Sequence, residues 1–265
     1  MKNNTISPNG NILAATLRIY SNPDPGSEYV ARQIADVIKE KQSRGQKTIL
    51  GLATGATPKG VYRNLINLHQ NEGLSFRDVI TFNLDEYYPI EPTHELSYVT
   101  FMHEQLFNHI DMAPENIHIP CGTLKRDEIE GYCNVYEQKI RDLGGLDIQL
   151  LGIGRTGHLG FNEPGSVPES LTRLVDLNEI TRNDAIDDFG GIENVPVQAI
   201  TLGLKAILNA KKIFLVAWGD RKAEIVQKAL EGTVSSDVPA SFLQSLPTVE
   251  YILDQNSAAL LSKVG

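Results

Sequence analysis

Residues 150–165 have the sequence LLGIGRTGHLGFNEPG, and this stretch decides how the rest of the chain is interpreted. Its first residues belong to an apolar run from Ile148 to Ile153, which has the length and composition of a buried β-strand. A glycine-rich turn follows, and then come a single imidazole, His158, and a carboxylate, Glu163. A buried strand that ends in glycines, an imidazole and a carboxylate indicates a functional site rather than packing.

Strand-like and helix-like patterns alternate on both sides of this stretch. Strand-like segments are 48–53, 79–84, 116–119, 147–153, 200–202, 213–218 and 249–253. Helix-like segments are 27–44, 58–73, 97–110, 127–143, 204–208 and 220–230. The alternation predicts an α/β fold that is Rossmann-like, with a mainly parallel sheet and helices on both faces.

The length of 265 residues and the hydrophobic content of 41% suit a single domain of this kind. We expect residues 1–24 to be an N-terminal tail and residues 25–265 to be the domain. Residues 173–199 are rich in Asp, Asn and Gly and show no clear periodicity. We expect this segment, called the flap below, to cover the site.

Composition and charge exclude several classes of protein. The net charge is −9 without any basic run, so we expect no nucleic-acid partner. There is no apolar run of membrane-spanning length and no signal-like N-terminus, so we expect no membrane contact. Cys121 and Cys133 fit neither a zinc site nor a disulfide framework, which favours reduced thiols in a cytoplasmic protein.

Three polar segments follow predicted strands: Thr54–Thr57, Asp85–Glu86 and Gly154–Glu163. In parallel α/β sheets, ligands bind beyond the carboxyl ends of the strands. We therefore expect these segments to converge on one site.

The turn Thr54-Gly55-Ala56-Thr57 connects a strand to a helix N-terminus. Backbone N–H groups and hydroxyls at such a position suit a phosphate, although an ordinary strand-to-helix turn has a similar composition. Lys222 begins a later helix and could reach over the same face as an anion clamp, or it could simply be solvated.

Asp85 and His158 are the candidates for proton transfer. A carboxylate at a strand end can act as a base when a partly dry cleft raises its pKa, whereas in a solvated loop it cannot. Turns in the loop after residue 153 could bring Glu163 to His158 and so orient the imidazole. No metal-ligand spacing is present, so we expect no metal.

Gly152-x-Gly154-x-x-Gly157 matches the dinucleotide-binding fingerprint, but this interpretation fails on context. The fingerprint requires a helix to start at once after the first strand. Here Phe161 to Gly165 interrupts any such helix, and the strand is not the first.

Taken together, these segments resemble the glucosamine-6-phosphate deaminase family. The matching stretches are GLATGATP at 51–58, TFNLDEY at 81–87, SYVTFMH at 97–103 and GRTGHLGFNEP at 154–164. The resemblance extends over about residues 25–255, and Asn-x-Asp-Glu-Tyr together with Gly-His-x-x-Phe-Asn-Glu-Pro is a specific combination. The related 6-phosphogluconolactonases share the fold and the Gly-His pair but lack Phe-Asn-Glu-Pro.

The resemblance implies conversion of glucosamine 6-phosphate and water into fructose 6-phosphate and ammonia, without a cofactor. It implies that His158 assists ring opening, that Glu163 holds and charges the imidazole, and that Asp85 moves a proton between C2 and C1. The phosphate would bind at Gly55, Ala56, Thr57 and Lys222, beside Thr54. A small sugar phosphate is the expected partner, with a homo-oligomer as an open expectation.

The chain departs from the family pattern around the imidazole and in the flap. Thr156 stands where many members have Asp or Asn as a further imidazole partner. Asp187 stands where well-studied members have a flap arginine that grips the phosphate, so Arg182 or Arg155 would have to substitute, or phosphate affinity is reduced.

A third departure concerns the effector site of the activated members, which binds N-acetylglucosamine 6-phosphate. Ser166 and Arg173 match that site, but Val175 replaces its lysine, so we expect no allosteric activation. Two other functions stay open: a deaminase for another amino-sugar phosphate, such as galactosamine 6-phosphate, and a non-catalytic sugar-phosphate sensor.

Overall fold

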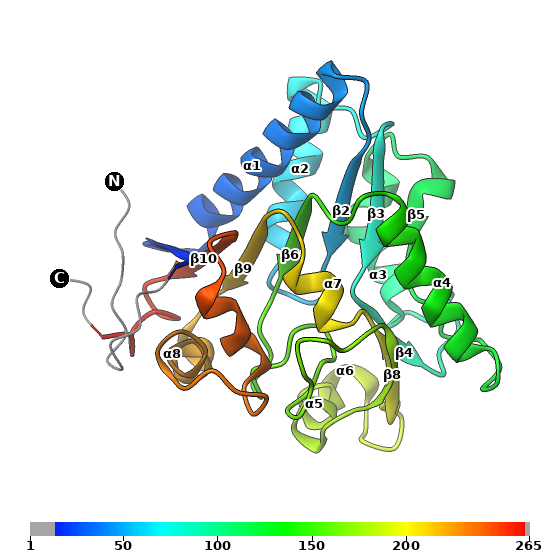
Figure 1. Ribbon diagram of the computed structural model, residues 1–265, viewed down its shortest axis with the longest axis vertical. Coiled ribbons are helices and arrows are strands. Elements are labelled where there is room, and N and C mark those ends of the chain that lie inside the picture. Colours follow the sequence, from blue (N-terminus) through cyan, green and yellow to red (C-terminus); the bar gives the residue numbers. More distant parts are fainter. Residues whose placement is uncertain (1–13, 263–265) are drawn as a thin grey trace.

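The computed structural model describes residues 14–262 and shows a twisted parallel sheet between two layers of helices (Figure 1). The strands are β1 (Thr16–Tyr20), β2 (Thr48–Leu52), β3 (Val79–Asn83), β4 (Asp85–Tyr88), β5 (Ile117–His118), β6 (Ile148–Leu151), β7 (Arg173–Asp176), β8 (Gln198–Thr201), β9 (Ile213–Ala217) and β10 (Val249–Asp254). The α-helices are α1 (Pro23–Ser43), α2 (Lys59–Glu72), α3 (Tyr98–Gln105), α4 (Ile129–Asp142), α5 (Glu179–Asp184), α6 (Ile186–Phe189), α7 (Leu204–Leu208) and α8 (Ala223–Glu231).

The main sheet has seven strands in the order β1-β10-β9-β6-β2-β3-β5, and each of its pairs is parallel. This confirms the predicted α/β fold. The strand that carries the opening stretch, β6, lies between β9 and β2 in the middle of the sheet. The polar segments that follow β2 and β6 therefore emerge side by side at the same edge.

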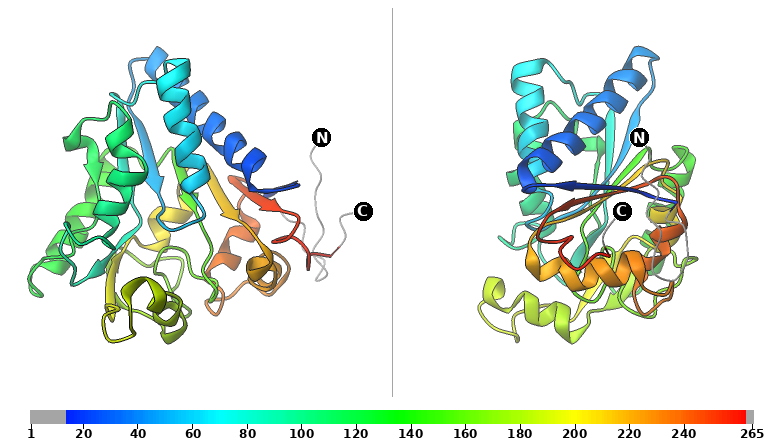
Figure 2. Two further views of the ribbon diagram at one scale, coloured as in Figure 1. Left: turned by 180° about the vertical axis from the view of Figure 1, so that it is seen from behind. Right: turned by 90° about the vertical axis from the view of Figure 1, so that its left-hand side faces the viewer.

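Each face of the sheet carries its own hydrophobic core, because successive strand residues point to opposite faces. On β2, Leu50 packs with α1, α2 and α3, whereas its neighbour Ile49 packs with α4, α7 and α8. Figure 2 shows the two helical layers on either side of the sheet. The helices start and stop at local signals: Asn22 caps α1, Ser97 caps α3, and Gly73 ends α2 in a left-handed conformation.

A second, three-stranded antiparallel sheet in the order β4-β8-β7 lies at the carboxyl edge of the main sheet. It changes one expectation, because Asp85 and Glu86 begin strand β4 and do not form a polar loop after β3. It also organises the flap, which contains β7, α5 and α6 and returns through β8. The covering role of the flap remains a prediction.

The prediction that residues 1–24 form a tail is wrong from Thr16 onwards. Residues Thr16–Tyr20 form the edge strand β1, which pairs in parallel with β10, and α1 already begins at Pro23. The partner of β1 lies at the other end of the chain, so the local sequence carries no sign of the pairing. Residues 1–13 of the expected tail lie outside the described residues.

Candidate active site

The three polar segments predicted to converge line one cavity of about 360 Å³ at the carboxyl edge of the main sheet. Its walls come from the turn after β2, the start of β4, the loop after β6, the flap and the short helical turn before α8. The lining residues with polar side chains are Thr54, Thr57, Asp85, Tyr87, Tyr98, Arg155, His158, Thr181, Asp184, Asp188 and Lys222.

The turn Thr54–Thr57 lies directly ahead of the N-terminus of α2, as predicted. Gly55 has φ of +89°, a conformation that side chains rarely adopt, so glycine is required for this turn. The positive end of the α2 dipole faces the cavity from the turn and favours an anion there.

Lys222 lines the same cavity and is not a solvated lysine. Its Nζ atom donates a hydrogen bond to the backbone oxygen of Ile153 at 2.7 Å, and burial lowers the pKa of the ammonium group. The cation therefore lies beside the turn, where a phosphate group would compensate its charge.

Asp85 is buried, with 5% of its surface exposed, which excludes the solvated loop considered above. Burial, reinforced by the charge of Glu86, raises the pKa of Asp85 to about 8. The neighbouring Gly160 leaves room for the carboxyl group, because a Cβ atom at that position would lie 3.1 Å from Asp85 Oδ2. A carboxyl group with such a pKa can give and take a proton near neutral pH.

Glu86 anchors β4 to the next helix, a role that the sequence did not indicate. Its carboxylate accepts hydrogen bonds from the backbone N–H groups of Tyr87, Tyr98 and Val99, at 2.9, 3.0 and 3.1 Å. Burial raises the pKa of Glu86 to about 7, although these three bonds oppose the shift. This link holds the start of α3, and with it Tyr98, at the cavity wall.

His158 and Glu163 form the expected pair, with Glu163 Oε2 3.2 Å from His158 Nδ1. Two threonine hydroxyls complete the cluster. Thr156 Oγ1 donates to Glu163 Oε2 at 2.8 Å, and Thr181 Oγ1 donates to Glu163 Oε1 at 2.5 Å. The same two hydroxyl oxygens lie 3.0 and 3.3 Å from His158 Nδ1.

These contacts determine the imidazole tautomer. A hydroxyl has one hydrogen, and both threonines donate it to the carboxylate, so each offers only a lone pair to Nδ1. Nδ1 therefore faces three acceptor oxygens and must carry the ring hydrogen, which leaves the lone pair on Nε2. Nε2 lies over Gly154, where a Cβ atom would be only 2.0 Å away, so this glycine makes room for the ring.

Glu163 is the charged member of the pair. Burial alone would raise the pKa of Glu163, but its hydrogen bonds with His158, Thr181 and Thr156 outweigh burial and hold this pKa below its ordinary value. An ionised Glu163 would stabilise the imidazolium that forms when Nε2 takes a proton. Thr181 was missed from the sequence because it belongs to the flap, which lacks periodicity.

The structure distinguishes between Arg182 and Arg155, the two cations that could substitute for a flap arginine. Arg182 donates to the backbone oxygens of Ile192 and Val195, at 2.9 and 3.1 Å, and does not line the cavity. Arg155 does line it, and its guanidinium binds Asp184 of α5 at 2.7 Å. Asp187 is exposed and is not among the lining residues.

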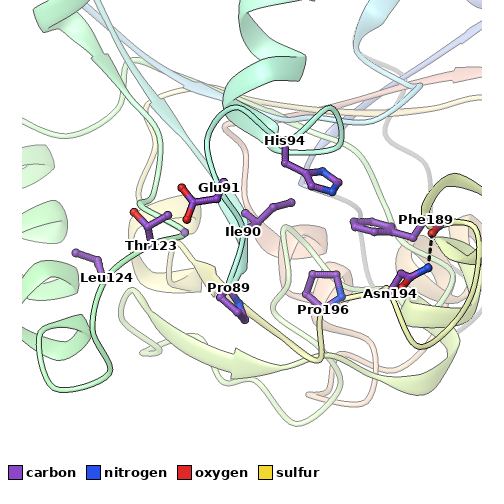
Figure 3. A pocket seen from close by; sticks show the side chains of 10 residues that line it. Pro89, Ile90, Glu91, His94, Thr123, Leu124, Phe189, Asn194 and Pro196 are labelled. Carbon is purple, nitrogen blue, oxygen red and sulfur yellow. Dashed lines mark hydrogen bonds between the residues drawn. The ribbon is translucent and has the colours of Figure 1, made fainter.

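A second cavity, of about 390 Å³, is lined in part by the flap residues Phe189, Asn194 and Pro196 and by none of the predicted site residues (Figure 3). Phe189, at the end of α6, lines this second cavity. The Phe189 ring stacks on His94 with ring centroids 6.1 Å apart and meets Tyr87 edge-on at 5.3 Å. Figure 3 shows Phe189 beside His94 and Asn194, whose side chain donates to the Phe189 backbone oxygen.

Comparison with known proteins agrees with this fold. Residues 21–250 match the family model of glucosamine-6-phosphate isomerases/6-phosphogluconolactonase. Glucosamine-6-phosphate deaminase 1 of Bacillus subtilis is 47% identical over 234 residues, covering 88% of this chain and 94% of the relative. A glucosamine-6-phosphate deaminase-like protein of Bacteroides thetaiotaomicron is 44% identical over 246 residues, but this chain spans only 37% of its length.

A solved structure described as a monomeric glucosamine-6-phosphate deaminase superposes with a TM-score of 0.87 at 45% identity, covering 92% of this chain and 99% of that one. The 6-phosphogluconolactonase of Trypanosoma brucei, at 22% identity and a TM-score of 0.74, shares the fold. The fold and the cavity define a sugar-phosphate enzyme class. This chain belongs to the glucosamine-6-phosphate isomerase/6-phosphogluconolactonase family.

Two further findings concern membrane-spanning helices and metal-binding clusters among the described residues. Within residues 14–262, no helix has both the length and the apolar composition needed to cross a membrane. In the same range, no cluster of three or more His, Cys, Asp or Glu side chains could hold a metal ion.

Proposed function

We propose that this chain converts glucosamine 6-phosphate and water into fructose 6-phosphate and ammonia. The observation that carries the proposal is that one cavity holds both proton-transfer groups, His158 and Asp85, beside the anion-binding turn and Lys222. The close relatives that carry the deaminase name support the choice of substrate.

The reaction follows from the placement of these groups. The Thr54–Thr57 turn and Lys222 bind the phosphate and so hold the sugar in one orientation. The Nε2 atom of His158 moves a proton between the ring oxygen and the C1 hydroxyl and opens the ring. Glu163 stabilises the imidazolium that this transfer creates.

Asp85 then carries out the isomerisation on the open chain. It takes the proton from C2 while the C1 carbonyl oxygen gains a proton from the C2 ammonium group, which gives an enolamine. It then returns a proton to C1, which gives a ketimine at C2. Water adds to C2 and ammonia leaves, which gives the ketose phosphate. A base whose pKa lies near 8 suits a group that must both accept and return a proton.

The test is ammonia release from glucosamine 6-phosphate, galactosamine 6-phosphate and unphosphorylated glucosamine. We expect fast release from the first substrate only, and its loss in Asp85→Asn. Full activity in Asp85→Asn would remove Asp85 from the mechanism. Equal rates with glucosamine would remove the phosphate site, and preference for galactosamine 6-phosphate would establish the alternative substrate.

A further inference from the structure

The cluster around His158 is built from two parts of the chain. Thr156, His158 and Glu163 come from the loop after β6 and contact one another within that loop. Thr181 comes from α5 in the flap and reaches both Glu163 and His158. Thr181 is also buried, with 9% of its surface exposed.

The two carboxylate oxygens of Glu163 have different partners. Oε2 accepts from Thr156 and faces His158 Nδ1, so the loop itself holds this oxygen. Oε1 accepts from Thr181 at 2.5 Å, so the flap holds it. If the flap lifts, Oε1 loses this donor and the carboxylate can rotate away from the imidazole.

From this division we infer that Thr181 is a positioning residue, which holds the His158–Glu163 pair in its reactive arrangement only while the flap is seated. The inference rests on the proposed function, in which His158 opens the sugar ring. It gives the flap a chemical role beyond covering the cavity, because proton transfer then proceeds only when the flap covers the substrate.

Three further sets of contacts describe the position of the flap in the structure, which is its seated position. Arg182 ties α5 to the backbone oxygens of Ile192 and Val195 inside the flap, and Asp184 joins the flap to Arg155 of the loop after β6. Phe189 packs against Tyr87 and against His94, and Figure 3 shows it beside His94. Thr181 lies on the same helix as Arg182 and Asp184, so its hydroxyl follows the position of this helix.

Other ionisable groups also face the cavity and contribute to any pH profile. They are Asp85, Tyr87, Tyr98, Arg155, Asp184, Asp188 and Lys222. None of them is changed in the variants below, so a difference between those profiles reports on the Glu163 cluster.

The first experiment compares Thr181→Val, Thr181→Ser and the control Asn183→Ala in the ammonia-release assay across pH. Valine keeps the shape but removes the hydroxyl, so we expect kcat to fall about ten-fold with KM within about two-fold of the wild type. Loss of a donor to the carboxylate raises the pKa of Glu163, so the acid limb of kcat should move to higher pH. Thr181→Ser should recover most of the activity, and the exposed Asn183 should tolerate alanine.

Two outcomes would overturn the inference. One is a Thr181→Val enzyme with the kcat and acid limb of the wild type. The other is a Thr181→Ser enzyme that is impaired as much as Thr181→Val, which would assign the effect to packing of the methyl group.

A double-mutant cycle with Arg182→Ala tests the link to the flap. Removing the guanidinium breaks the bonds that hold α5 to Ile192 and Val195 inside the flap and leaves Glu163 unchanged. Helix α5 is then held less firmly, so Arg182→Ala should lower kcat as well. The double variant should then be no worse than Thr181→Val, because both changes remove the same support. If the losses of kcat in the two single variants multiply in the double variant, Thr181 acts independently of the flap, which would contradict the inference.

A measurement without substrate separates this inference from the proposed function. ¹⁵N NMR of the histidine ring should show a single Nδ1–H tautomer for His158 in the wild type and in Asn183→Ala. Thr181→Val should show tautomer exchange, and an unchanged His158 signal would overturn the inference even if no ammonia were released. If the wild type releases no ammonia while Thr181→Val still shows tautomer exchange at His158, only the proposed function is overturned.

Discussion

Asp85 is a carboxyl group that the fold holds away from water beside a second buried carboxyl group, Glu86. The free energy needed to keep it there comes from the rest of the fold. The pKa of Asp85 is raised in the folded state, so the folded protein binds more protons than the unfolded chain between about pH 4 and pH 8. Its ionisation therefore weakens folding as the pH rises through this range.

Asp85→Asn should accordingly inactivate the enzyme and stabilise the fold. We expect a loss of at least about 10²-fold in kcat, the range for a missing acid–base group. The free energy of unfolding should exceed that of the wild type at pH 8 by about 1 kcal/mol or more, and the gain should shrink at pH 5. Urea denaturation at both pH values checks this, and an equal effect at the two would contradict the raised pKa.

Thr156 shows how one substitution is absorbed at the residue scale. The family carboxylate or amide is replaced by a hydroxyl, which donates to Glu163 and offers only a lone pair to His158. The carboxylate of Glu163 is therefore the negatively charged group beside the imidazole. That the flap supplies a second hydroxyl, Thr181, could not be predicted, because the contact spans 18 residues without periodicity.

At the scale of elements, the loop after β6 and the flap helix α5 meet through Arg155 and Asp184 as well. Both side chains line the cavity, and we predict that Arg155 contacts the phosphate in place of a flap arginine. Asp184 forms an ion pair with Arg155. A bound phosphate would compete with Asp184 for the guanidinium group.

Arg155→Ala should therefore raise KM for glucosamine 6-phosphate about ten-fold and change kcat little, because it removes a contact to the phosphate and leaves the reacting carbons in place. Arg221→Ala is the matched control, since Arg221 is exposed, neighbours Lys222 and does not line the cavity. Steady-state kinetics of both variants checks this. A rise in KM in the control alone would argue that Arg155 does not bind the phosphate.

On the scale of the whole molecule, a stabilising cluster around Asp147 lies at the end of the main sheet opposite the cavity. Asp147 precedes β6, on the side away from the cavity, and is 6% exposed. It binds Lys41 of α1, accepts from Lys211 at 2.8 Å and accepts from the Ile49 backbone N–H at 2.8 Å. Burial raises the pKa of Asp147, but these partners outweigh burial and hold it below its ordinary value.

Asp147→Asn should destabilise the fold by about 2 kcal/mol at pH 7 and leave kcat unchanged. A carboxyl group with a depressed pKa stabilises the fold above its unfolded pKa, and that contribution is lost as the pH falls through the folded value. The difference between variant and wild type should therefore shrink from pH 7 towards pH 4 in urea denaturation. A large loss of kcat would show that the two ends are coupled.

The effector site of the activated relatives is represented only in part. Ser166 and Arg173 lie together, with the guanidinium donating to the serine hydroxyl at 3.0 Å, but Val175 of β7 supplies no cation. We predict hyperbolic kinetics that N-acetylglucosamine 6-phosphate does not alter. A sigmoidal rate curve that this compound makes hyperbolic would contradict the prediction, and light scattering of the purified protein would decide between a monomer and the homo-oligomer.

The sequence alone determined the parallel α/β fold and the convergence of three strand ends, because hydrophobic period, glycine turns and helix caps are local signals. It also indicated that Asp85, His158 and Lys222 would share one site, with Glu163 beside His158. Only the tertiary structure decided the edge strand β1, the second sheet that buries Asp85 and the flap contact through Thr181. Each of these features depends on contacts between residues that are distant in the chain, and such contacts produce no periodic pattern in the local sequence.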